Sequence, residues 1–97
     1  MIDLKTATLN DFKPMVGTRF ELRQGDSAFA DVTLSEAISL GQSRREGGAV
    51  SLVFEGPEEL MLEQGTFTLL SDTDVMDLFL VPIGPFGKGM GFEAVLT

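Results

Sequence analysis

Short apolar runs separated by glycine and proline constrain this chain more than any other feature of its sequence. The chain has 97 residues, and its 11 Gly and 4 Pro fall between the apolar runs and do not form one block. Glycine and proline in such positions end strands and form turns, and runs of this length suit strands joined by hairpins. The pattern therefore predicts one domain, spanning residues 1–97, that is mostly β-sheet.

Apolar and polar residues alternate within most of these runs, as expected for strands with one buried face. In the first run, Phe20 and Leu22 alternate with arginine and glutamate. Strands are expected at about residues 18–24, 29–40, 49–55, 66–71, 75–83 and 91–97. Six strands at this spacing predict an all-β fold, either an antiparallel sandwich or a small closed barrel.

One short helix is expected at the N-terminus, at about residues 6–14. Thr8 precedes Asp11 by three residues, which resembles a capping box with Asp in place of Glu. Leu9 and Phe12 lie on one face of this helix, so we expect that face to pack against the sheet.

Alternation also predicts which side chains of the second strand point into the core. Four apolar residues of the second strand are expected to point inward: Val32, Leu34, Ile38 and Leu40.

The glycine-rich segment 84–91 is expected to be a flexible hairpin loop. It does not match a phosphate-binding loop, because Lys88 is followed by Gly89 where that motif requires Ser or Thr.

The absence of Cys, His, Trp and Tyr removes much catalytic chemistry. Without them the chain has no thiolate nucleophile, imidazole base, disulfide or zinc site of the usual kind. Fifteen acidic and seven basic residues give a net charge of −8, which disfavours nucleic acid as a partner. We therefore expect no enzyme activity and no cofactor.

Three carboxylates fall close together after the fourth strand, at Asp72, Asp74 and Asp77. Ca²⁺ favours such oxygen clusters, but an EF-hand loop needs Gly at its sixth position and Glu at its twelfth. Counted from Asp72, these positions hold Asp77 and Ile83. An Asp-rich hairpin turn is the favoured interpretation, and weak Ca²⁺ binding is the alternative.

The fifth strand is apolar on both faces. Leu78 and Leu80 lie on one face, and Phe79 and Val81 lie on the other. Because an antiparallel strand with one face in water should alternate, something is expected to cover the second face. Either the N-terminal helix packs over it or closes a barrel mouth, or the face contacts another protein chain, since aromatic residues and Met are enriched in interfaces.

The residues expected at such an interface are Met76, Phe79, Val81, Phe86 and Met90. The last two would contribute from the glycine-rich loop. The only basic pair, Arg44 and Arg45, is a candidate contact for an acidic partner surface.

Several motifs resemble a group of small bacterial domains of unknown function. They are Asp11-Phe12 with Val16-Gly17-x-x-Phe20, Val53-Phe54-x-Gly56-Pro57, Leu62-x-Gln64-Gly65-Thr66-Phe67-x-Leu69, and Phe79-Leu80-Val81-Pro82-Ile83-Gly84-Pro85 followed by Phe92-Glu93-Ala94-Val95. The resemblance spans nearly the whole chain. It implies a link to proteins that resemble phage tail collars, and thus a structural or assembly role.

No signal peptide is visible, because the N-terminus lacks a basic region followed by an apolar stretch. The densest apolar run, 75–81, is far shorter than the ~20 residues needed to span a bilayer. We therefore expect a cytoplasmic protein without membrane insertion, and incorporation into an exported assembly stays open.

The expected function is that of a non-enzymatic structural or protein-interaction module that binds a protein partner or itself. The alternative is a β-barrel that binds a small apolar ligand between Phe20, Phe54, Phe67 and Phe92. An interior of about six strands leaves little room for such a ligand, because side chains already fill a barrel of about eight strands.

Overall fold

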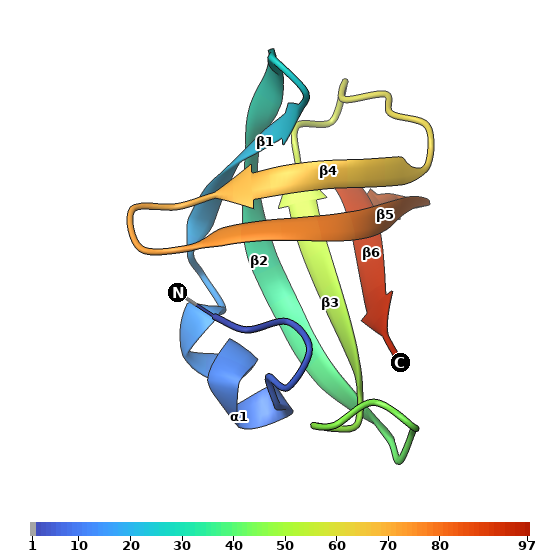
Figure 1. The fold of residues 1–97 in the computed structure, drawn as a ribbon. Helices are drawn as coiled ribbons and strands as arrows, with labels where there is room; N and C mark the ends of the chain where they lie inside the picture. The colour runs from blue at the N-terminus through green and yellow to red at the C-terminus, as the bar shows by residue number, and fades with distance from the viewer. Residues whose placement is uncertain (1) are drawn as a thin grey trace.

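Six antiparallel strands and one short helix make up the fold of residues 2–97, which are those that the computed structural model describes (Figure 1). In chain order the elements are α1 (Leu9–Phe12), the 3₁₀ turn η1 (Lys13–Met15), β1 (Arg19–Gln24), β2 (Ser27–Gly41), β3 (Ala49–Gly56), β4 (Gly65–Leu70), β5 (Val75–Phe86) and β6 (Gly89–Leu96). The prediction of an all-β fold with a short N-terminal helix is confirmed.

The six strands form one sheet that closes into a barrel in the order β1-β2-β3-β6-β5-β4. Strand β5 takes part in two halves of this barrel: Val75–Leu80 pair with β4, whereas Val81–Phe86 run beside β6. The closure itself is short, because β1 and β4 pair only through Glu21–Arg23 and Thr68–Leu70. A closed sheet leaves few edges for unwanted pairing.

Large apolar side chains fill the barrel. Phe20 and Phe54 meet edge to face with their ring centroids 5.9 Å apart, a favourable arrangement for aromatic rings. The largest side chains of the core are Phe12, Phe20, Phe54, Phe92, Leu22, Leu34, Leu52, Leu69, Met76, Leu78, Leu80 and Val32. The phenylalanines expected to surround a ligand therefore pack into the core.

Helix α1 lies at one end of the barrel, near the β2–β3 loop (Figure 1). The Asp11 carboxylate accepts a hydrogen bond of 2.8 Å from the Thr8 backbone N–H, which caps the helix as the spacing predicts. Phe12 is fully buried in the core. The helix thus closes the barrel mouth, and it is shorter than expected because η1 replaces its last turn.

A bulge in β2 overturns the predicted orientation of two residues. Leu34 lies opposite Phe54 but Glu36 lies opposite Val53, so Ser35 is an extra residue in the ladder. One extra residue moves every later side chain to the other face of the sheet. Ile38 and Leu40 consequently point outward and are about half exposed, and their predicted inward orientation is wrong.

Most of segment 84–91 is strand, so its prediction as a flexible loop is wrong. The turn between β5 and β6 has only two residues, Gly87 and Lys88. Two other glycines mark places where atoms approach closely: a Cβ at Gly89 would overlap the Gly56 carbonyl oxygen, and one at Gly91 would collide with Phe86. Glycine inside a strand often has this origin.

Candidate protein interface

The outward side of β5 is apolar and uncovered. Phe79 is 52% exposed and Val81 is 37% exposed, whereas Leu78 and Leu80 are buried. Met76 shares the inward orientation of these leucines and is 0% exposed. Its predicted place in the interface is therefore wrong, and the physical reason is the period-2 alternation of the strand.

The exposed apolar area continues from β5 onto the neighbouring strands. Val95 of β6 lies opposite Ser51 of β3, which in turn lies opposite Ile38 of β2. We call the area formed by Ile38, Phe79, Val81, Ile83 and Val95 the outer face; apart from Val81, each of these side chains is about half exposed. Helix α1 closes the barrel mouth and leaves these residues exposed.

Sequence reasoning missed three members of the outer face, namely Ile38, Ile83 and Val95. The orientation of Ile38 depends on the bulge at Ser35, which alternation alone does not locate. Val95 has the same outward orientation as Glu93. Alternation counted from the inward Phe92 also places Val95 outward, so the sequence contains the signal for finding it.

A carboxylate lies within the outer face. Glu93 pairs with Val53 on one side and with Val81 on the other. Its Oε2 accepts a hydrogen bond of 2.7 Å from the hydroxyl of Ser51, a side chain that is only 3% exposed. The hydrogen bond holds the carboxylate against the sheet, where it adds a fixed negative charge to the apolar surface.

The two predicted interface residues from the glycine-rich segment lie in strands. Phe86 is half-buried, and its Cβ covers the backbone of Gly91. Met90 is half-buried and packs against the core. Met90 also lines an apolar groove of about 500 Å³ with Leu60, Met61, Leu62, Glu63, Pro82 and Phe92. Both residues are thus less exposed than a loop would leave them.

The three aspartates predicted for an Asp-rich turn are divided between two elements: Asp72 and Asp74 lie in the turn between β4 and β5, and Asp77 lies in β5. Asp74 accepts hydrogen bonds from the backbone N–H of Ile2 and from the Thr73 hydroxyl. Asp77 accepts one of 2.6 Å from the Thr68 hydroxyl. Across residues 2–97, no group of three carboxylate, imidazole or thiol side chains is placed to hold a metal ion.

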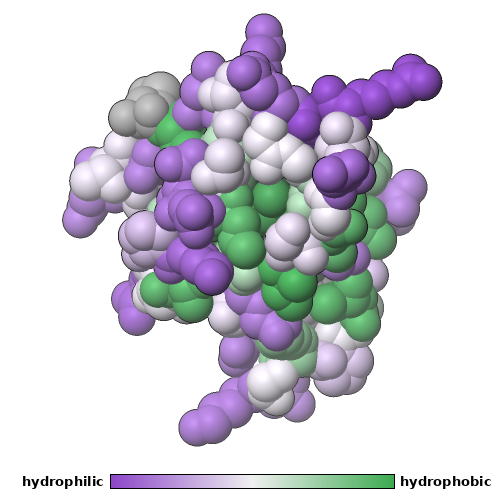
Figure 2. Space-filling model, turned by 90° about the horizontal axis from the view of Figure 1, so that it is seen from below, coloured by the Kyte–Doolittle hydropathy of each residue, from purple (hydrophilic) through white to green (hydrophobic). Residues whose placement is uncertain are grey.

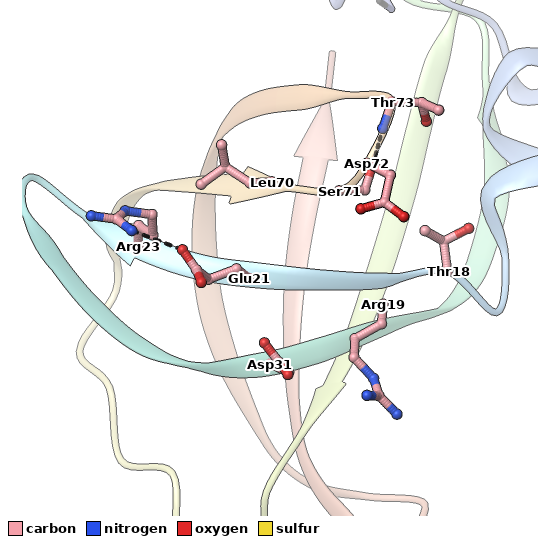
Figure 3. A pocket seen from close by; sticks show the side chains of 9 residues that line it. All are labelled: Thr18, Arg19, Glu21, Arg23, Asp31, Leu70, Ser71, Asp72 and Thr73. Atoms are coloured by element: carbon pink, nitrogen blue, oxygen red, sulfur yellow. Dashed lines mark hydrogen bonds and ion pairs between the residues drawn. The ribbon is translucent and has the colours of Figure 1, made fainter.

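A polar groove of about 790 Å³ lies where β1 diverges from the turn after β4 (Figure 3). The turn contributes Ser71, Asp72 and Thr73 on one side of β1, and β2 contributes Asp31 on the other. The Ser71 hydroxyl in this groove is already engaged, because Ser71 Oγ accepts hydrogen bonds from the backbone N–H groups of Thr73 and Asp74. These contacts give the serine a role in the turn.

Charges in this groove are mixed. Arg23 forms an ion pair of 2.8 Å with Glu21, and both side chains are partly exposed (Figure 3). Arg19, Asp31 and Asp72 add one positive and two negative charges. With signs interspersed in this way, the groove does not select strongly for one charge, and an exposed pair contributes little free energy.

These features define a small closed β-barrel domain of six antiparallel strands with an uncovered apolar outer face. Residues 7–96 match the family model of a domain of unknown function, DUF6916, so the chain belongs to this family. No curated protein and no solved structure is a significant match to the chain. Between residues 2 and 97, no helix is long and apolar enough to cross a membrane.

Proposed function

We propose that this protein is a non-enzymatic structural or protein-interaction module and that its outer face contacts another protein chain. The observation that carries the proposal is the contiguous exposure of Phe79, Val81, Ile83 and Val95 on β5 and β6. Single exposed apolar residues are ordinary, but contiguous patches with an aromatic residue are typical of contact surfaces.

A role in assembly is the specific form that we propose. The motif resemblance to domains linked with phage-tail-collar-like proteins supports a place in a phage-tail-like or appendage structure. Chains in such structures bind one another through repeated surfaces, which an apolar sheet face on a rigid barrel can supply.

Photo-crosslinking tests the proposal with a matched pair of positions. Phe79 and Phe29 are both exposed phenylalanines, at 52% and 43%, but Phe29 lies on β2 and packs edge to face on the core residue Phe67, and it is not a member of the outer face. Each is replaced in turn by p-benzoylphenylalanine in cells that express the full chain. Crosslinks to a second copy or to one discrete protein are expected at position 79 and not at position 29.

Two results contradict the proposal. One is the absence of any discrete crosslinked species at position 79. The other is an equal pattern at both positions, which would mean that crosslinking reflects the exposure of a phenylalanine and not a specific surface.

A further inference from the structure

The β3–β4 loop presents an apolar side chain within a set of acids. Met61 is 82% exposed, more than any other large apolar side chain in residues 2–97. Glu58, Glu59 and Glu63 are exposed around it. We call the segment 58–63 the knob.

Packing on both sides fixes the outward orientation of Met61. Leu60 and Leu62 are partly buried and pack against the core. The Leu60 backbone N–H also donates a hydrogen bond of 3.0 Å to the Pro57 carbonyl oxygen, which tightens the start of the segment. Since the residues before and after Met61 are anchored inward, its side chain is held in solvent at the tip of the knob.

A hollow with the opposite charge lies on another part of the molecule. It has a volume of about 520 Å³ and is lined by Leu4, Lys5, Arg44, Arg45, Val95, Leu96 and Thr97. Leu4, Val95 and Leu96 supply apolar surface. The hollow brings together three of the seven basic residues of a chain with a net charge of −8, so its positive charge stands out from the rest of the surface.

Hydrogen bonds preform the hollow. The Arg45 guanidinium donates to the Leu4 carbonyl oxygen at 2.7 Å and to the Gly48 carbonyl oxygen at 2.9 Å. The β2–β3 loop also lies tightly against the N-terminal segment, because a Cβ at Gly47 would lie 2.6 Å from the Ala7 carbonyl oxygen. Arg45 therefore ties the loop to the N-terminal segment, and Arg44 and Lys5 are the more exposed cations.

The knob and the hollow lie at opposite ends of the barrel. Figure 1 places the β3–β4 loop at the upper end, and the β2–β3 loop and the C-terminus at the lower end. The lower end is the one seen in Figure 2, where apolar residues are exposed between polar ones. One end thus offers an apolar side chain bordered by three carboxylates, and the other offers an apolar surface bordered by three cations.

We propose that the knob of one copy of this chain inserts into the hollow of a second copy. Met61 would contact Leu4, Val95 and Leu96, while the glutamates of the knob would face Lys5 and Arg44. Because the two surfaces differ, the contact is heterologous, and repetition gives an open chain or a ring of copies. This contact involves the two ends of the barrel, whereas Phe79 lies on its side, in the outer face. Val95 borders both surfaces.

The contact is expected to be weak and sensitive to salt. Each chain carries a charge of −8, and this repulsion acts beside the local attraction. Local pairs form at contact distance, whereas salt screens exposed charges beyond about 8 Å at physiological ionic strength. Self-association is therefore expected at high protein concentration and physiological ionic strength, where salt screens the long-range repulsion between copies more than the pairs in contact.

Sedimentation equilibrium up to millimolar concentration measures this association directly. Met61→Asp is expected to weaken it about tenfold or more, because a charge replaces the apolar centre of the contact. The double variant Lys5→Glu with Arg44→Glu should weaken it similarly. Matched controls are Asp26→Lys and Lys13→Glu, which change exposed charges outside the knob and the hollow and should associate like the wild type.

The decisive test is to mix two variants in which the charges of the knob or of the hollow are reversed. A knob variant, Glu58→Lys with Glu59→Lys and Glu63→Lys, has like charges at both of its ends, and so does the hollow variant Lys5→Glu with Arg44→Glu. Each should be monomeric alone and folded by far-UV circular dichroism. Mixed together, they should associate, because each then meets an end of opposite charge.

Several outcomes overturn the inference. A wild-type chain that stays monomeric at millimolar concentration and physiological ionic strength refutes it, as does wild-type association that Met61→Asp leaves unchanged. Folded charge variants that fail to associate when mixed also refute it. Since none of these variants changes Phe79 or Val81, the inference can fail while the crosslinking at position 79 still succeeds.

Discussion

Replacing Phe12 with alanine is expected to lower the free energy of unfolding by about 3–5 kcal/mol, the usual cost of truncating a fully buried phenylalanine. Phe12 is 0% exposed and belongs to the core. It is also the only buried residue of α1, a helix of four residues. Helices shorter than about 12–15 residues are marginal in water by themselves, so the Phe12 contacts hold α1 against the barrel mouth.

The loss is large relative to the whole stability of a domain, which is typically about 5–15 kcal/mol. For a domain of this size each kcal/mol shifts Tm by about 4–8 °C, so Tm should fall by at least about 12 °C. Urea unfolding followed by far-UV circular dichroism is the appropriate assay, because the chain has no Trp or Tyr for intrinsic fluorescence.

Val16→Ala is the control, because Val16 follows η1 and is 43% exposed. Its loss should stay below about 1 kcal/mol, in proportion to the smaller apolar area removed from water on folding. If Phe12→Ala also costs less than about 1 kcal/mol, Phe12 does not close the barrel in the way described, and the reasoning is wrong.

Two further substitutions test local features of the fold by the same urea assay. Gly89→Ala should cost about 1–3 kcal/mol or more, because its Cβ would overlap the Gly56 carbonyl oxygen. Gly65→Ala should be close to neutral, because its Cβ would meet the end of the Gln24 side chain at 3.4 Å and the Phe67 ring at 3.8 Å, which are ordinary contacts. Equal losses would contradict this difference in space. Asp74→Ala should cost about 1 kcal/mol, because the Ile2 N–H and the Thr73 hydroxyl lose their acceptor. Its control, Asp72→Ala, should change stability by less than about 0.5 kcal/mol, as is usual for an exposed site. A larger loss for Asp72→Ala than for Asp74→Ala would be evidence against the described turn.

Much of the fold is predictable from the sequence because the strands obey a simple period. Inward residues such as Phe20, Leu22 and Phe54 alternate along their strands, and the capping box at Thr8 marks the start of α1. Alternation fails where the period is broken. The extra residue at Ser35 reverses the orientation of Ile38, and no local property of Ser35 identifies it as the bulge.

The candidate surfaces are less predictable than the strands. Phe79 and Val81 were expected at the surface of β5 because both faces of that strand are apolar, and this prediction depended on local sequence. Met76 was misplaced, although the same alternation puts it inside. The hollow brings Leu4 together with Arg44 and Leu96, which are far apart in the chain, so only the closure of the barrel reveals it.

The short β1–β4 seam has a consequence for the motions of the barrel. Glu21–Arg23 and Thr68–Leu70 close the ring, whereas β4, β5 and β6 follow one another in the chain and are joined by turns. Contacts between segments near in sequence form early and cost little chain entropy to restore, whereas the seam joins segments that are far apart. Partial opening of the native state should therefore begin at this seam, where β4 separates from β1 while most of the ladder stays intact.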